Sequence, residues 1–137
     1  MKRFRILIVE DNSNYRNLLK ETLQKCLPRI SVDEAKNGGM AFQKIDTFHP
    51  DLIFMDIRLA TENGLQLTKR IKAMHPHIVV FVITFYGTPE YQKAAFESGA
   101  DTFLTKASLS PVELEELLKL AQILSNRLKM PEKMVLN

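Results

Sequence analysis

The stretch DLIFMDIRLA, from Asp51 to Ala60, decides how the rest of the sequence is interpreted. The run from Leu52 to Met55 is continuously apolar, which is typical of a parallel strand that is covered on both faces. Asp56 follows this run directly, although a carboxylate there is costly to bury and adds nothing to packing. The stretch therefore predicts a central strand that carries a functional acid at its carboxyl end.

Apolar runs of strand length alternate with stretches of helical period on both sides of that segment. Further strands are expected at 4–9, 30–35, 78–83 and 102–105, and the run 30–35 is the weakest, which suits an edge strand. Helices are expected over about 12–27, 40–48, 65–74, 88–98 and from 110 onward. Pro28, Pro50, Pro76 and Gly99 end the first four helices, and Ser110-Pro111 begins the last. Five β/α pairs predict an α/β domain with an open, doubly wound parallel sheet and helices on both faces, because 137 residues are too few for an eight-fold barrel.

The composition excludes several classes of protein. The chain is 45% hydrophobic and 26% charged, which suits one globular domain, and its longest apolar run, 78–83, is far shorter than the roughly 20 residues of a membrane span. Its single cysteine, Cys26, lies on an apolar helix face, so we expect core packing and a reducing, cytoplasmic setting. The net charge of +3 is scattered along the chain, so we expect no direct nucleic-acid binding and no membrane partner.

Reactive side chains follow four of the five expected strands. They are Glu10-Asp11, Asp56, Thr84 and Lys106. Because ligands of such sheets bind beyond the carboxyl ends of the strands, we expect these groups to converge at one edge. Three neighbouring carboxylates repel one another, and a hard cation such as Mg²⁺ relieves that repulsion, whereas histidines and cysteines are too few for a zinc site.

This set of groups favours phosphoryl transfer. A metal ion and an ammonium group neutralise phosphate oxygens, a hydroxyl donates to another, and a carboxylate can act as the nucleophile. Asp56 is the best candidate nucleophile because it lies on the central run. The chain has no G-x-x-x-x-G-K-[ST] and no G-x-G-x-x-G, so we expect the donor to be another protein or a small phosphodonor.

An ordered set of motifs resembles the receiver domain of two-component response regulators. The motifs are ILIVEDN, DLIFMDIRL, the pair Asn63-Gly64, VVFVIT and GADTFLTK, which together cover about residues 4 to 125. The resemblance implies a flavodoxin-like sheet with the strand order 2-1-3-4-5, and this order rests on the resemblance alone.

The resemblance also implies roles for individual residues. Asp56 would accept a phosphoryl group from a histidine kinase or phosphotransfer protein, and the chain would act as a switch and not as an enzyme, beyond catalysing its own phosphotransfer and dephosphorylation. Phosphorylation would change the surface of the fourth helix, fifth strand and fifth helix and so control an output, which would be transcription if a longer chain carries this domain. The implied contacts are Glu10, Asp11, Asp56 and the backbone carbonyl of Arg58 for Mg²⁺ or Mn²⁺, Thr84 and Lys106 for the phosphoryl group, and Phe103 as the switch aromatic.

The sequence departs from the family pattern near this site. Ala60 and Thr61 stand where proline and glycine are frequent, and Ala107 stands where proline is usual, so we expect a trans bond before Ala107. Phe85 replaces a small residue and is expected to restrict access to the phosphoryl group. Arg58 and Tyr86 also border the site and are expected to tune the access of water.

The last helix has two apolar faces in the sequence. Val112 and Ile123 lie nearly opposite the main stripe and Leu120 lies at its edge, so they are either scattered surface residues or a partner surface for a homodimer or effector, shared with the fourth helix. We expect a receiver domain over 1–128 and a tail or linker over 129–137, because Pro131 breaks the helix. The stripe expected to face the sheet is Leu114, Leu117, Leu118, Ala121, Leu124 and Leu128.

Two alternatives use the same fold. One is a protein-interaction module that works without phosphate, which the intact set of reactive groups disfavours and Phe85 keeps open. The other is a Mg²⁺-dependent phosphohydrolase, for which the sequence offers no evident general base and no insertion that would bind a substrate.

Overall fold

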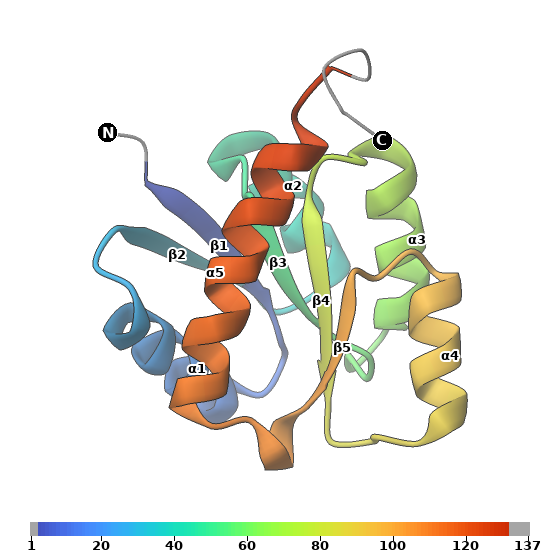
Figure 1. Ribbon diagram of the computed structural model, residues 1–137. Helices are drawn as coiled ribbons and strands as arrows, with labels where there is room; N and C mark the ends of the chain where they lie inside the picture. The colour runs from blue at the N-terminus through green and yellow to red at the C-terminus, as the bar shows by residue number, and fades with distance from the viewer. Residues whose placement is uncertain (1–2, 132–137) are drawn as a thin grey trace.

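The computed structural model describes residues 3–131, without the side chain of Ser108. Five parallel strands form one sheet in the order β2-β1-β3-β4-β5, as expected (Figure 1). The strands are β1 (Phe4–Val9), β2 (Ile30–Ala35), β3 (Leu52–Asp56), β4 (Val79–Thr84) and β5 (Thr102–Thr105). The helices are α1 (Ser13–Cys26), α2 (Gly38–Phe48), α3 (Gly64–Met74), α4 (Pro89–Glu97) and α5 (Pro111–Leu128), with a short 3₁₀ helix, η1 (Lys106–Ser108), before α5.

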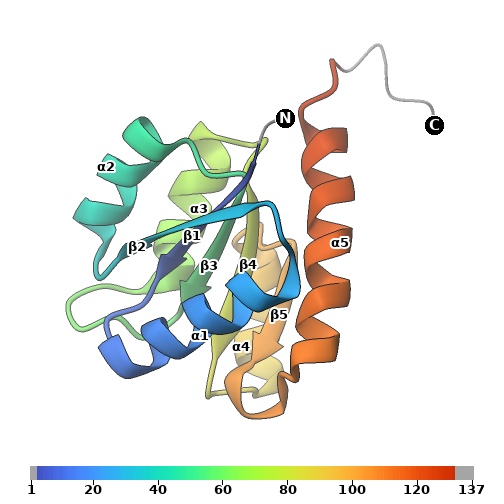
Figure 2. The ribbon, with the colours of Figure 1, turned by 90° about the vertical axis from the view of Figure 1, so that its left-hand side faces the viewer.

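The helices cover both faces of the sheet, which confirms the doubly wound architecture. Helices α1 and α5 pack on one face, and α2, α3 and α4 lie on the other (Figures 1 and 2). Side chains of β1 alternate between the two layers, since Ile6 and Ile8 face α1 and α5 whereas Leu7 and Val9 face α2 and α3. The central strands are therefore buried on both sides, which explains their continuous apolar runs.

Polar side chains set the start of every α-helix. Asn37 caps α2 by accepting from the backbone N–H of Met40, so this helix begins at Gly38, two residues before the apolar spacing predicted it. Ser110 caps α5 in the same way, because its hydroxyl accepts from the backbone N–H of Glu113. The same hydroxyl donates to the Glu113 carboxylate at 3.1 Å. The other caps are Asn12, Asn63 and Thr88.

Some boundaries and burial assignments differ from the sequence prediction. Strand β3 includes Asp56, because Asp56 pairs with Ile83 in the sheet register. Strand β4 runs from Val79 to Thr84, so each of its ends lies one residue later than expected. Leu128, expected on the stripe that faces the sheet, is 36% exposed, because it lies at the end of α5. Leu18 (59%) and Met74 (62%) are also exposed, Leu18 at the margin of the buried face of α1 and Met74 at the end of α3.

Two other expectations, on Cys26 and on the bond before Ala107, are confirmed in the part of the chain that the structure describes. Cys26 is half-buried and packs against the core. Residues 3–131 contain no cis peptide bond, so the bond before Ala107 is trans. None of the helices among these residues is both long enough and apolar enough to cross a membrane.

Candidate functional site

The carboxyl ends of β1, β3, β4 and β5 meet at one edge of the sheet, the lower edge in Figure 1. Glu10 follows β1 directly, Asp56 is the last residue of β3, and Thr84 is the last residue of β4. Lys106 follows β5 and begins η1. The topology thus brings to one edge the reactive residues that the sequence places far apart.

Three carboxylates converge at this edge. Glu10, Asp11 and Asp56 each offer an oxygen that lies within 4.8 Å of the others. Glu10 and Asp56 are buried, at 2% and 6% exposure, whereas Asp11 is exposed. Carboxylate oxygens that leave one side open to water suit Mg²⁺, which retains several water ligands. The residues present therefore fit the expected metal ion, and the Arg58 carbonyl stays a predicted ligand.

Lys106, directly after β5, forms ion pairs with two of these carboxylates. Its Nζ forms an ion pair with Oε1 of Glu10 and lies 3.4 Å from Oδ2 of Asp56. The side chains of Lys106 and Glu10 are each 3% exposed and that of Asp56 is 9% exposed, so solvent screens this cluster weakly. One ammonium group thus offsets part of the charge of two buried carboxylates.

The pKa of Glu10 is raised from its ordinary value. Burial is the largest cause, a hydrogen bond with Asp56 adds to it, and Lys106 opposes it in part. The negative charge at this edge is therefore incompletely compensated by the protein, and either a proton or a divalent cation would stabilise it.

Two aromatic rings cover the Lys106 ammonium group. Its Nζ lies 4.4 Å from the ring centroid of Tyr15 and 4.8 Å from that of Phe85, and the two rings meet edge to face at 6.0 Å. Burial, with the charges of Glu10 and Asp56, raises the pKa of Tyr15 to about 12, so its hydroxyl stays protonated. Tyr15 is a residue of this edge that the sequence did not point to, although its position four residues after Asp11, in the first turn of α1, was a usable signal.

The loop after β4 forms the other side of the site. Thr84 is fully buried, and its Oγ1 accepts a hydrogen bond of 3.2 Å from the backbone N–H of Tyr86. The Arg58 guanidinium stacks on the Tyr86 ring, 4.1 Å from its centroid, and donates to the Tyr91 hydroxyl at 3.2 Å. Arg58 thus connects the loop after β3 to Tyr86 and to Tyr91 of α4, and the contact with Tyr91 was not predicted from the sequence.

Gly64 lets α3 begin close to the end of β3. A Cβ at this position would lie 1.8 Å from the backbone oxygen of Asp56, which no side chain tolerates. The backbone N–H of Gly64 instead donates to the carbonyl of Ile57 at 2.8 Å. The pair Asn63-Gly64 therefore holds the chain beyond Asp56 against the start of α3.

Phe103 lies on β5, three residues before Lys106. It is half-buried and packs with Ile57, Val82, Ala95 and Ala100 between the sheet and α4. This position links the strand that carries Asp56 to α4, and the switching role of Phe103 stays a prediction.

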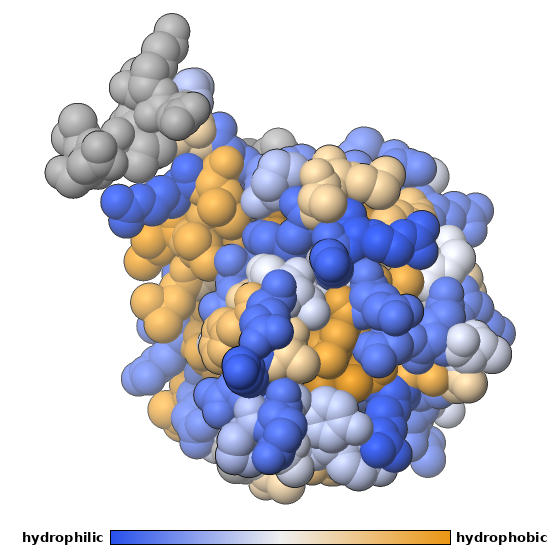
Figure 3. Space-filling view, turned by 90° about the vertical axis from the view of Figure 1, so that its right-hand side faces the viewer, coloured by the Kyte–Doolittle hydropathy of each residue, from blue (hydrophilic) through white to orange (hydrophobic). Residues whose placement is uncertain are grey.

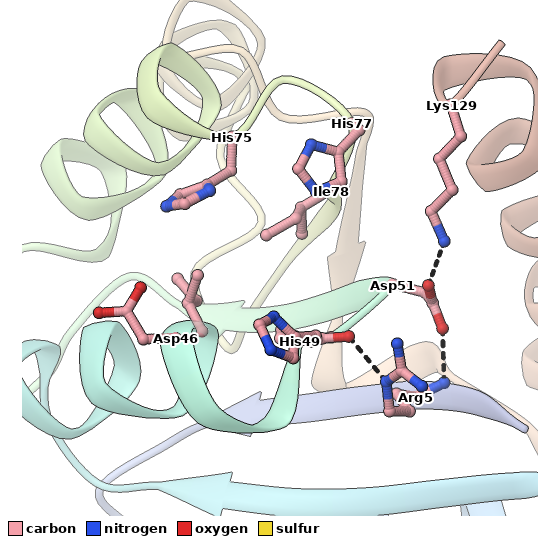
Figure 4. Close-up of a pocket in the computed structure, with 10 residues that line it drawn as sticks. Arg5, Asp46, His49, Asp51, His75, His77, Ile78 and Lys129 are labelled. Atoms are coloured by element: carbon pink, nitrogen blue, oxygen red, sulfur yellow. Dashed lines mark hydrogen bonds and ion pairs between the residues drawn. The ribbon is translucent and has the colours of Figure 1, made fainter.

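The opposite edge of the sheet holds a separate hollow of about 510 Å³ (Figure 4). All three histidines of the chain, His49, His75 and His77, line it. Asp51 accepts from the backbone N–H of Arg5 at 2.8 Å and pairs with Lys129, and Arg5 Nε donates to the His49 carbonyl at 2.8 Å. These contacts tie the end of α5 to the start of two strands, so this hollow has no part in the acidic site.

The family comparison matches this arrangement of fold and site. A family model described as the response regulator receiver domain covers residues 6–122. The chain belongs to this family. It is a receiver domain of two-component signalling, with the acidic edge where a phosphoacceptor site is expected.

Curated relatives of this receiver domain include single-domain and longer proteins. It is 32% identical to chemotaxis protein CheY of Halobacterium salinarum, with 82% of this chain and 92% of that protein covered. It is 30% identical to sporulation initiation phosphotransferase F of Bacillus subtilis, with 85% and 90% covered. It is 37% identical to a cyclic di-GMP phosphodiesterase of Thermotoga maritima, where the match covers 89% of this chain but only 31% of that protein.

Solved structures show the same fold. The receiver domain of NtrX from Brucella abortus has a TM-score of 0.77 at 29% identity, with 85% of this chain and 96% of that chain covered. A putative response regulator from Chloroflexus aurantiacus has a TM-score of 0.78 at 28% identity, with 90% and 99% covered.

Proposed function

We propose that this receiver domain accepts a phosphoryl group on Asp56 from a histidine kinase or phosphotransfer protein and acts as a signalling switch. One observation carries the proposal: the oxygens of Glu10, Asp11 and Asp56 converge at an edge of the sheet that also holds the Lys106 ammonium group. A purely structural edge has no need of three carboxylates, because their mutual repulsion destabilises the fold.

The chain's own groups account for the transfer step. A carboxylate oxygen of Asp56 forms the new bond to phosphorus while the bond from phosphorus to the donor atom breaks, which gives an acyl phosphate. Lys106 offsets charge on the transferred group, and the Thr84 hydroxyl donates a hydrogen bond to one of its oxygens. A Mg²⁺ or Mn²⁺ ion held by Glu10, Asp11, Asp56 and the Arg58 carbonyl would supply further charge neutralisation when bound.

The switch is proposed to act through Thr84 and Phe103. Phosphorylation replaces the single negative charge of the Asp56 carboxylate with up to about two on the phosphoryl oxygens, and Thr84 moves toward these oxygens. Phe103 then turns inward and changes the surface of α4, β5 and α5, as a population shift between two packings. The output is a partner protein or, where a longer chain carries this domain, transcription.

Three side chains are proposed to control access to the phosphoryl group. Phe85 is 61% exposed and Tyr86 is 43% exposed, and both stand in the loop directly after Thr84. Arg58 is held over Tyr86 from the loop after β3. Such a cover would slow attack by water and lengthen the lifetime of the acyl phosphate.

Loading of Asp56 tests the proposal directly. Wild-type protein, Asp56→Asn and the control Asp46→Asn, which alters an exposed acid on α2, are treated with Mg²⁺ and a small phosphodonor, and intact mass is measured. We expect one added phosphoryl group on wild type and on Asp46→Asn, and none on Asp56→Asn. An unmodified wild type, with no response to beryllofluoride either, would contradict the proposal.

A protein-interaction module that works without phosphate is the second candidate. The Phe85 ring over Lys106 favours it, because this ring narrows the approach to Asp56. Catalysis on outside substrates is a third reading, and multiple turnover of a phosphate ester would be its signature. The receiver reading instead requires at most one phosphoryl group per chain in each cycle.

The remaining assignments are proposals of the same kind. We propose a cytoplasmic protein whose receiver domain spans 1–128, followed by a tail or linker over 129–137, of which 132–137 lie outside the described residues. Helices α4 and α5 are the proposed partner surface, and direct contact with nucleic acid or membrane is not part of the proposal.

A further inference from the structure

The outward face of α5 carries an apolar stripe that no described residue covers. Figure 2 shows α5 at the outer margin of the fold, and apolar residues gather along the left-hand edge in Figure 3. At helical spacing the stripe lies opposite the buried residues Leu114 and Leu118. Its apolar members on α5 are Val112, Leu120 and Ile123, which are 69%, 59% and 64% exposed, and Met130, two residues beyond the end of the helix, is 50% exposed.

Two opposite charges complete this stripe. Glu116 and Arg127 are exposed, and neither forms an ion pair or side-chain hydrogen bond within residues 3–131. In contrast, Lys119 and Glu115 beside the stripe pair with each other at 3.5 Å. The positions 116, 120, 123, 127 and 130 follow the alternating spacing of four and three that forms the seam between two packed helices.

We propose that α5 of a second copy of this chain covers the stripe, in antiparallel orientation around a two-fold axis. With the axis between Leu120 and Ile123, Leu120 packs against the partner's Ile123, and Glu116 pairs with the partner's Arg127. The same register brings Met130 to the first turn of the partner helix, near the partner's Val112. A parallel pair in register would instead oppose like charges at both positions, which disfavours that arrangement.

The contact rests on the proposed partner surface in naming a partner for α5, but it does not require that Asp56 is modified. The stripe contains no residue of the acidic edge and none of α4 or β5, so it exists in the unmodified protein. One face of the 18-residue helix α5 offers fewer contact residues than the roughly 20–30 that each partner contributes to a usual interface. The dimer is therefore weak, and its association reports on α5 whether or not Asp56 accepts phosphate.

Charge reversal tests both the partner and the register. Glu116→Arg and Arg127→Glu are made separately, and sedimentation equilibrium is measured up to about 1 mM, since a small interface supports dissociation constants of about 1 μM to 1 mM. Wild type is expected to dimerise, and each variant alone to dissociate at least tenfold more readily. A 1:1 mixture of the two variants is expected to recover dimers, because every facing pair is again of opposite charge.

Matched controls separate α5 from the rest of the surface. Lys93→Glu and Glu97→Arg reverse exposed charges on α4, and neither is expected to change association. Ile123→Asp is expected to abolish it, with the circular dichroism spectrum unchanged. A wild type that is monomeric at about 1 mM, an effect of the α4 reversals, or a mixture that fails to recover dimers would each overturn the proposal.

Discussion

At the scale of single residues, the acidic edge holds more negative charge than its one ammonium group offsets. Glu10 and Asp56 are buried within reach of one ammonium group, and Asp11 adds a third carboxylate from the surface. The raised pKa of Glu10 shows that this arrangement favours binding of a cation or proton. The same feature that destabilises the metal-free fold is the one that a divalent cation would relieve.

The pKa of Glu10 predicts how stability depends on pH. Because the folded chain holds this proton more tightly than the unfolded chain, Glu10 contributes stability that is full below pH 4.5 and is lost as pH rises through the raised pKa. Urea unfolding of metal-free protein should show this loss, and Glu10→Gln should lack it. The control Glu97→Gln, at an exposed position, should behave as wild type, and excess Mg²⁺ should oppose the loss. Equal pH slopes for wild type and Glu10→Gln would contradict this account.

Phe85 predicts slow exchange at the phosphoryl group. Its exposed ring lies 4.8 Å from the Lys106 ammonium group, so Phe85→Ala should open the approach to Asp56. We expect loading by a small phosphodonor and subsequent hydrolysis both to quicken by up to about tenfold, or roughly 1.4 kcal/mol of barrier. Decay of labelled phosphoprotein measures this, with Phe96→Ala on α4 as a control, 47% exposed in wild type. Unchanged decay would remove Phe85 from the access-controlling set.

At the scale of secondary-structure elements, α5 shows how one helix serves two surfaces. Leu114, Leu118 and Ala121 are buried against the sheet, whereas Leu120 and Ile123 point outward. Residues one or two positions apart in sequence therefore carry different functions, since a helix turns by about 100° per residue. The buried face contributes to stability through packing, and the opposite face is exposed to solvent.

Truncation of neighbouring leucines separates these two faces. Leu118 is fully buried, so Leu118→Ala should lower the free energy of unfolding by about 2–5 kcal/mol. Leu120 is 59% exposed, so Leu120→Ala should change it by less than about 0.5 kcal/mol at concentrations where the chain is monomeric. Denaturant unfolding of the two variants gives the comparison, and equal losses would mean that α5 packs in another rotation.

At the scale of the whole molecule, the fold connects the acidic edge to a distant surface. Arg58, in the loop after β3, contacts Tyr91 of α4, and Phe103 of β5 packs in the same cluster as Tyr91. A change at Asp56 can thus reach α4 and β5 through contiguous side chains. Phe103 is not among the residues that pack α1 and α2 against the sheet, so these helices are not joined to Asp56 through Phe103.

Hydrogen exchange would reveal whether this connection carries the signal. With Mg²⁺ and beryllofluoride, we expect slower exchange in the loops after β3 and β4 and altered exchange in α4 and β5, with α2 unchanged. Asp56→Asn should show none of these changes, because the mimic then has no carboxylate to bind. A response confined to the two loops would leave the site without a switch.

The sequence by itself determined the succession of strands and helices and the reactive residue at the end of each strand. Apolar periodicity, helix caps and proline positions are local signals, and carboxyl ends of parallel strands must share an edge, so Glu10, Asp56, Thr84 and Lys106 could be grouped without coordinates. The strand order came from family resemblance instead, and the structure confirms it.

Only the tertiary structure decided which side chains touch. The two rings over Lys106, the Arg58–Tyr91 hydrogen bond and the exposure of Leu18 and Met74 depend on how helices rotate and dock on the sheet. Tyr15 and Lys106 lie on segments joined only through the packing of α1 and β5 at the same edge. Periodicity fixes the direction of a side chain relative to its own element, but contacts between distant elements follow from the packing of the whole core.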